Sequence, residues 1–247
     1  MCYPSDPIQG KMRDLSQRYE FIPQWNLWYI LESEEYLLER CPEADREEFR
    51  QSIYGILNFM SRYENADGLL QDVPGWNFVE WSEANDWVKD VNYPTSFLYS
   101  RALEAAYRLY GDTAAMEKAE RIRRRAAELA FDGEVFCDHA VMQDGVLVNQ
   151  PHISEVCQYY AILLGGVSLA EPRYAKLLHY VKNGFADFQR KDCELVRINA
   201  FIGLYLRMEV LRCLGEYRLI LGELGDFFGG MVEKTGTLWE YRQYKGS

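Results

Sequence analysis

The sequence lacks the short motifs that identify many protein classes directly. It contains no phosphate-binding P-loop, no GxGxxG dinucleotide motif and no GxSxG nucleophile elbow, so nucleotide-binding and serine-hydrolase functions have no support. No run of about 18 apolar residues occurs, so we expect no membrane-spanning helix. Only three histidines are present, and we therefore expect no metal site built on histidine.

Basic residues are outnumbered by acidic ones. The chain has 27 Lys and Arg against 38 Asp and Glu, a formal net charge of −11 at pH 7. A surface of this sign repels phosphate backbones, so we expect no nucleic-acid partner. By contrast, 48% of the 247 residues are apolar and 15% aromatic, which is ample for a hydrophobic core. We predict a single domain over residues 1–247.

The six cysteines are far apart and form no CxxC pair. A disulfide framework is typical of short secreted chains, so we interpret these residues as reduced thiols that pack in the interior. Residues 1–10 lack the charged and then apolar order of a secretory signal. We therefore expect a cytoplasmic protein if the chain is complete; its location is otherwise unknown.

Apolar residues recur at steps of three and four along most of the chain, which predicts an all-α fold. Pro23, Pro42, Pro94 and Pro172 are placed to open helices, and Thr113 and Ser154 can cap two more. Proline is tolerated in the first turn because its missing N–H needs no partner there. We predict eight helices, over residues 24–40, 43–63, 94–110, 114–130, 154–164, 172–183, 199–214 and 216–228.

The links between these helices alternate in length. Short links follow the first, third, fifth and seventh helices, and the other four links are long, over 64–93, 131–153, 183–198 and 229–247. In an up-and-down array alternate links lie at the same end, so we expect the long links to share one rim. One of them, 135–148, predicts a β-hairpin around Asp144 and Gly145. A unit of about 50 residues then repeats, as in a helical toroid or solenoid.

The first long link has a composition suited to sugars. It contains Trp76, Trp81 and Trp87 among many carboxylates and amides. Indole faces can stack on the apolar faces of sugar rings, while carboxylates and amides hydrogen-bond to hydroxyls. Alternatively, the tryptophans only plug the end of the helix array. The polar residues between them are Asn77, Glu80, Glu83, Asn85, Asp86 and Asp90.

Two further groups could take part in proton transfer. Glu240 follows Trp239 directly, and a carboxylate beside an indole can have its pKa tuned by desolvation. On composition alone, a salt bridge at the rim explains Glu240 equally well. His139 and His152 lie in the second long link, where they could shuttle protons, bind hydroxyls or serve structure.

Five motifs distributed over the chain carry a family resemblance. They contain Trp76, Trp81 and Glu240 among the residues named above, and they occur in a fixed order. They are WNFVEW at 76–81, DVNYPT at 90–95, EVCQYYA at 155–161, NAFIGLYL at 199–206 and TGTLWE at 235–240.

These motifs resemble the bacterial α-L-rhamnosidases of glycoside hydrolase family 78. The resemblance implies helical hairpins of an (α/α)6 toroid, with an inverting glycosidase site at its loop-rich end and no cofactor. It implies that Glu240 is the general base, which activates water. The predicted sugar-binding residues are Trp76, Asn77, Glu80, Trp81, Asp90, Asn92, His139 and Trp239.

The sequence departs from the family in two ways. The DCPxRE-like motif that carries the family's general acid is absent, so the acid is unassigned. Four helical hairpins are visible where six close the barrel. We therefore expect part of a catalytic domain that hydrolyses terminal α-L-rhamnosides only weakly, or not at all, when isolated. An incomplete barrel would expose apolar helix flanks and favour self-association.

Other functions stay open at this stage. A different (α/α)6 carbohydrate enzyme, such as an unsaturated-uronide hydrolase or a sugar epimerase, would share the fold. An epimerase would need paired histidines in the cavity, for which His139 and His152 are the candidates. A noncatalytic carbohydrate-binding scaffold would keep the aromatic rim without the chemistry.

Overall fold

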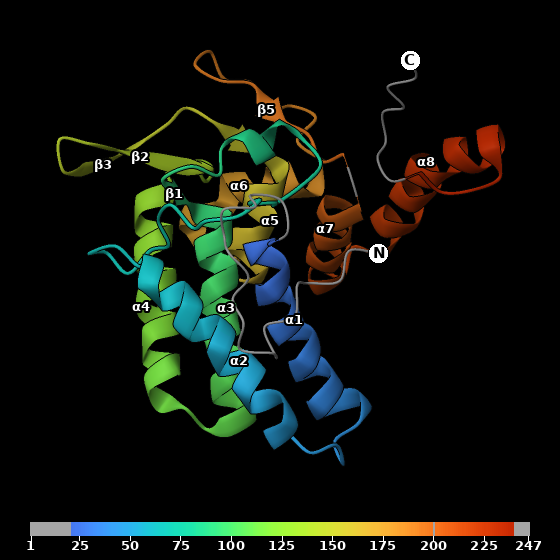
Figure 1. The fold of residues 1–247 in the computed structure, drawn as a ribbon. Helices are drawn as coiled ribbons and strands as arrows, with labels where there is room; N and C mark the ends of the chain where they lie inside the picture. Colours follow the sequence, from blue (N-terminus) through green and yellow to red (C-terminus); the bar gives the residue numbers. More distant parts are fainter. Residues whose placement is uncertain (1–20, 200, 240–247) are drawn as a thin grey trace.

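The computed structural model describes residues 21–199 and 201–239, and it is mostly helical (Figure 1). All eight predicted helices are present in this part of the chain. They are α1 (Pro23–Glu35), α2 (Glu47–Met60), α3 (Tyr93–Tyr110), α4 (Thr113–Ala130), α5 (Glu155–Leu163), α6 (Ala175–Lys182), α7 (Phe201–Cys213) and α8 (Tyr217–Thr235).

Several boundaries differ from the prediction for local reasons. Helix α2 begins four residues late, because the Asp45 carboxylate accepts the backbone N–H of Glu47 (2.9 Å) and holds a turn after Pro42. Asp112, rather than Thr113, caps α4 by accepting from Ala115 N. Helix α8 continues through Gly229 and Gly230 to Thr235. There, packing of Met231 against α7 outweighs the low helix propensity of glycine.

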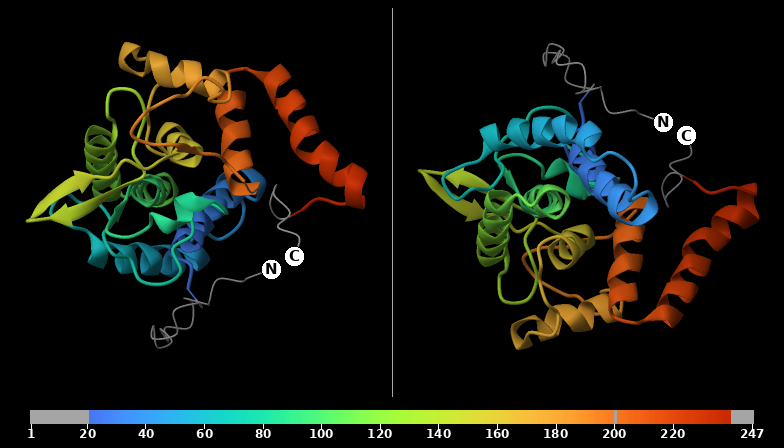
Figure 2. Two further views of the ribbon diagram at one scale, coloured as in Figure 1. Left: turned by 90° about the horizontal axis from the view of Figure 1, so that it is seen from above. Right: turned by 90° about the horizontal axis from the view of Figure 1, so that it is seen from below.

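The helices form hairpins in two rows. Seen from above, α1, α3, α5 and α7 form an inner arc, and α2, α4, α6 and α8 lie outside it (Figure 2). A large core fills the array, with buried aromatic side chains such as Tyr99, Phe97 and Tyr160 at its centre. Helix α8 packs on α7 through a separate small cluster of Leu204, Phe227 and Met231. The described residues make four hairpins, so a closed six-hairpin ring and a single domain over 1–247 remain predictions.

The long links between α2 and α3, α4 and α5, and α6 and α7 lie at one end of the molecule (Figure 1). The links α1–α2 and α3–α4 lie at the opposite end. For these five links, this is the arrangement that the alternation of link lengths predicts. The fourth predicted long link, 229–247, is instead helical as far as Thr235, and its residues 240–247 lie outside the described part of the chain. We call the end that carries the long links the rim.

A small antiparallel sheet stiffens the rim. The predicted hairpin is confirmed as β2 (His139–Gln143) and β3 (Val146–Asn149), joined by Asp144 and Gly145, which both have positive φ (49° and 82°). The sequence did not predict that β1 (Val91–Asn92) adds to this sheet, with Asn92 opposite His139. Two further short strands, β4 (Ile153–Ser154) and β5 (Leu195–Val196), pair in parallel.

None of the described helices is long and apolar enough to cross a membrane. The five cysteines within the described residues are free thiols, and Cys137 and Cys157 among them are buried. The packing interpretation therefore holds for these two thiols, whereas Cys41 and Cys193 are half-buried and Cys213 is exposed.

Candidate functional site

Three aromatic side chains of the rim form one cluster, which we call the rim cluster: Trp76, Phe78 and Trp81. The ring centroids lie 5.5 Å apart for Trp76 and Phe78, 5.6 Å for Trp76 and Trp81, and 4.9 Å for Phe78 and Trp81. Trp81 keeps 39% of its surface exposed, whereas Phe78 is buried. The sequence prediction that tryptophans gather at the rim is therefore confirmed for Trp76 and Trp81.

A glycine fixes the path of the backbone into this cluster. Gly75 has a φ of 106°, and a Cβ there would lie 2.6 Å from the carbonyl oxygen of Phe21. The next residue, Trp76, donates its backbone N–H to that same oxygen (2.9 Å). Only glycine combines this conformation with so close an approach.

The buried side chain of Gln24, at the start of α1, organises the loop from below. Its amide nitrogen donates to Asn77 Oδ1 and to Thr95 Oγ1, both at 2.9 Å, and its oxygen accepts the backbone N–H of Phe78. Asn77 in turn donates to the carbonyl of Val73 (2.6 Å). Sequence reasoning missed Gln24; its signal was a polar residue in the first turn of a helix with an apolar face.

Glu80 has no exposed surface. Its carboxylate accepts the backbone N–H of Asn199 (3.2 Å), while the Asn199 side chain donates to the carbonyl of Trp81 (2.7 Å). These bonds fasten the tryptophan loop to the start of α7. A sugar-binding role for Glu80 stays a prediction, and in this structure the side chain acts as a positioning group.

Asp90 and Asn92 have clear local roles. Asn92 caps α3, since its side-chain oxygen accepts from Thr95 N (3.0 Å) and from Thr95 Oγ1 (2.7 Å). Asp90 has a positive φ of 52°, and its backbone exchanges hydrogen bonds with Asp72. Both residues shape the rim next to the cluster, and direct contact of either with a sugar remains a prediction.

The two rim histidines are paired with each other. His139 Nε2 lies 2.7 Å from His152 Nδ1, and Trp87 stacks on His152 with ring centroids 4.6 Å apart. Burial, and then the neighbouring His152, lower the pKa of His139 to about 4, so its ring is neutral at pH 7. Direct contact leaves no space for a sugar between the rings, and this argues against an epimerase that uses them as opposed acid and base.

Trp239 lies at the end of the described chain. Its indole N–H donates to Thr235 Oγ1 (2.8 Å), and its ring packs beside the small cluster between α7 and α8. Glu240 lies outside the described residues, so its role as the general base remains a prediction.

A cavity of about 940 Å³ runs between the inner helices, and we call it the inner groove. Phe78 and Val79 of the rim loop line one part of it, and residues of α1, α3, α5 and α7 line the rest. Its aromatic residues Trp25, Trp28 and Tyr205 were missed from the sequence, because helical spacing makes such residues look like core. No group of three or more potential metal ligands occurs among residues 21–199 and 201–239.

The fold and rim together define an array of antiparallel helical hairpins with a loop-borne aromatic cluster at one end. No family model matches this sequence, and no curated protein does. Two solved structures share the fold. A GH78 family rhamnosidase of Bacillus sp. GL1 matches with a TM-score of 0.71 and 22% identity, over 90% of this chain and 23% of that protein. A rhamnosidase from Klebsiella oxytoca, with rhamnose bound, matches with a TM-score of 0.69 and 14% identity, over 90% of this chain and 41% of that chain.

This chain thus resembles one part of two longer rhamnosidases. At these identities the likeness concerns the fold. The chain spans about a quarter of one neighbour and about two fifths of the other.

Proposed function

We propose that this chain is part of a glycoside hydrolase that removes terminal α-L-rhamnose, with its sugar pocket at the rim. The observation that carries the proposal is the rim cluster, which presents Trp81 to solvent on a fold shared with solved rhamnosidases. Rhamnose is a deoxy sugar with a methyl group and apolar C–H faces, and indole rings bind such faces well. Half-buried Asn77 and Asp90 lie in the same loop, where they can meet hydroxyl groups.

The proposed chemistry is inverting hydrolysis. One carboxyl group protonates the leaving oxygen, and a carboxylate roughly 6.5 to 9.5 Å away activates water on the opposite face of the sugar. We assign the second role to Glu240, on the resemblance of its TLWE motif, and leave the acid unassigned. Without the acid the chain loses general acid catalysis, a factor of about 10² to 10⁴. We therefore expect weak turnover or none from this chain alone.

The first test measures binding. Titration of this chain with L-rhamnose, followed by tryptophan fluorescence, should show saturable binding that Trp81→Ala weakens by about tenfold, the loss of one stacking contact. The matched control is Tyr107→Ala on α3, which removes an equally exposed aromatic ring (40%) away from the rim. Equal affinity of the Trp81→Ala variant and the wild type would place the pocket elsewhere.

The second test separates a catalyst from a binding protein. In the intact protein that contains this chain, Glu240→Gln should lower turnover of an aryl α-L-rhamnoside by at least about 100-fold, because the general base is lost. Affinity for rhamnose should persist. Undiminished turnover would refute the assignment of Glu240. Binding without turnover in the unmutated intact protein would identify a noncatalytic carbohydrate-binding scaffold instead.

A further inference from the structure

The inner groove has one wall on α1. Trp25, Trp28, Glu32, Glu35 and Glu39 follow one another at steps of three and four residues, so they lie on a single face of the helix and its π-helical extension, Tyr36–Arg40. From Trp25 to Glu39 this face extends about 20 Å. The groove is therefore extended along α1.

The opposite wall is α7. Ile202, Tyr205, Glu209 and Arg212 line the groove with the same helical spacing. The two walls approach near the rim, where the rings of Trp28 and Tyr205 lie 6.4 Å apart with an interplanar angle of 75°. These two rings contact each other edge to face, so the aromatic surface left for a ligand is the exposed part of Tyr205 and of Trp25.

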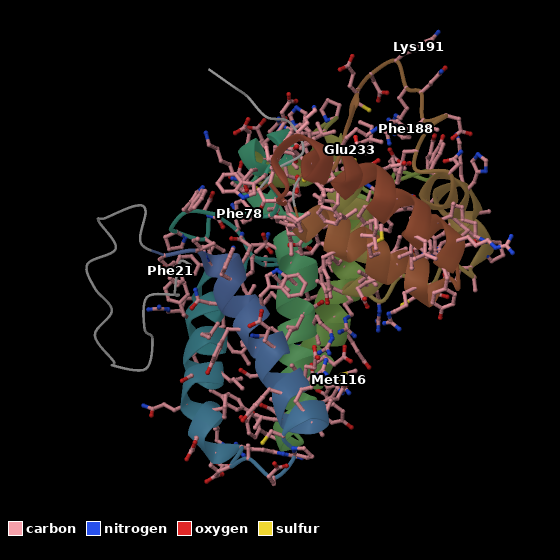
Figure 3. The ribbon with its side chains drawn as sticks, turned by 90° about the vertical axis from the view of Figure 1, so that its right-hand side faces the viewer. Phe21, Phe78, Met116, Phe188, Lys191 and Glu233 are labelled. Atoms are coloured by element: carbon pink, nitrogen blue, oxygen red, sulfur yellow. The ribbon has the colours of Figure 1, made fainter. Side chains whose placement is uncertain are left out.

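The groove is continuous with the rim. Phe78 belongs both to the rim cluster and to the lining of the groove. It lies close to the first turn of α1 (Figure 3). Val79 also lines the groove and accepts a hydrogen bond from the hydroxyl of Tyr160 on its floor (3.5 Å). The groove therefore reaches the rim loop at the buried side chains of Phe78 and Val79.

The charges along the groove nearly cancel. Its lining contains five glutamates and four arginines. On the floor the buried carboxylate of Glu34 pairs with Arg101 (2.5 Å) and Arg108 (2.7 Å). On the walls Arg40 pairs with Glu35, and Arg212 with Glu209, both at 2.8 Å. Such a lining offers many hydrogen-bonding atoms but little net attraction for an ion.

We propose that the inner groove binds a neutral oligosaccharide, the part of the substrate that precedes the terminal rhamnose. This inference rests on the proposed function. Aromatic rings along a groove suit successive sugar rings, and paired carboxylates and guanidinium groups suit their hydroxyls. The volume falls within the range of about 300 to 1,000 Å³ that small-molecule sites occupy. The near-neutral lining disfavours a polyanionic chain.

The experiment compares two probes on this chain by calorimetry: L-rhamnose, and a neutral tetrasaccharide of rhamnose. Rhamnose fills only the rim, so the tetrasaccharide should bind at least about tenfold more tightly. Tyr205→Ala and Trp25→Ala should remove most of that advantage and leave the affinity for rhamnose unchanged. Both side chains are about half exposed, at 52% and 44%, so their loss should not unfold the protein. The matched control is Tyr217→Ala, which removes an exposed tyrosine ring on α8 that does not line the groove.

The outcomes separate the two proposals. If Trp81→Ala weakens both probes but neither groove variant weakens the tetrasaccharide, the groove proposal is wrong and the rim pocket stands. If neither probe binds, both proposals fall. Tight binding of an oligogalacturonate would contradict the neutral ligand class. If the wild type is a dimer and Tyr205→Ala a monomer by light scattering, the groove is an interface between copies of this chain instead.

Discussion

The carboxylate of Glu80 accepts a hydrogen bond from the backbone N–H of Asn199, 119 residues further along the chain, at 3.2 Å. The Asn199 side chain completes the connection by donating to Trp81. One pair of residues thus joins the tryptophan loop to α7, a wall of the inner groove. The two proposed parts of the substrate site are therefore held together through Glu80 and Asn199.

Replacement of Glu80 should test this connection. Glu80→Ala leaves the backbone N–H of the half-buried Asn199 without this charged acceptor, which should lower the free energy of unfolding by about 1 to 3 kcal/mol. Urea denaturation measures the change. The control is Glu83→Ala, which removes an exposed carboxylate from the same loop and should cost less than about 0.5 kcal/mol. Equal stabilities of the two variants would show that Glu80 does not fasten the loop.

The helices could be predicted from the sequence because their signals are local. Ser154 caps α5 as predicted, accepting from Cys157 N (3.1 Å), and Gly111 ends α3 with a left-handed φ of 71°. The candidate site is different. Gln24 contacts Asn77, 53 residues away, and Glu80 contacts Asn199, so their roles depend on tertiary neighbours that no local pattern specifies. Trp28 and Tyr205 face each other only after α1 and α7 are packed.

Asn92 should prove to be mainly a helix cap. Asn92→Ala removes the acceptor of Thr95 N and should destabilise the protein by about 0.5 to 2 kcal/mol, measured by urea denaturation. Asn92→Asp keeps a capping oxygen but loses the amide that donates to the carbonyl of Trp87 (3.1 Å), so it should recover only part of this stability. If Asn92→Asp is more stable than Asn92→Ala but binds rhamnose no better, the amide of Asn92 contributes to sugar binding, as the family resemblance predicts.

His139 should make stability fall in acid. Its folded-state pKa of about 4 lies below the ordinary value of 6.5, so between these values the unfolded state binds more protons. The stability of the wild type relative to His139→Gln should therefore decline as the pH falls from about 6.5 to about 4, by at most about 3 kcal/mol. Urea denaturation across this range measures the difference. Parallel curves for the two proteins would contradict a buried neutral imidazole.

Asp138 should have the opposite effect on the pH dependence of stability: its contribution should fall as the pH rises. The carboxyl is fully buried beside Ser154, and burial raises its pKa from 3.8 to about 7 even though hydrogen bonds from Ser154 lower it. Because the pKa is raised on folding, the folded state keeps this proton up to a higher pH than the unfolded state does. The stabilisation that this carboxyl contributes is fully present below about pH 4 and is lost as the pH rises to about 7. The loss amounts to at most about 4 kcal/mol.

Asp138→Asn is the appropriate test of this effect. Asparagine imitates the protonated carboxyl, because its oxygen can accept from Ser154 N and its amide can donate to Ser154 Oγ. Urea denaturation from pH 4 to pH 8 should show similar stabilities at the acid end and a growing advantage of the variant toward pH 8. If the wild type is the more stable protein at pH 8, then Asp138 is ionised and the donors of Ser154 outweigh its burial.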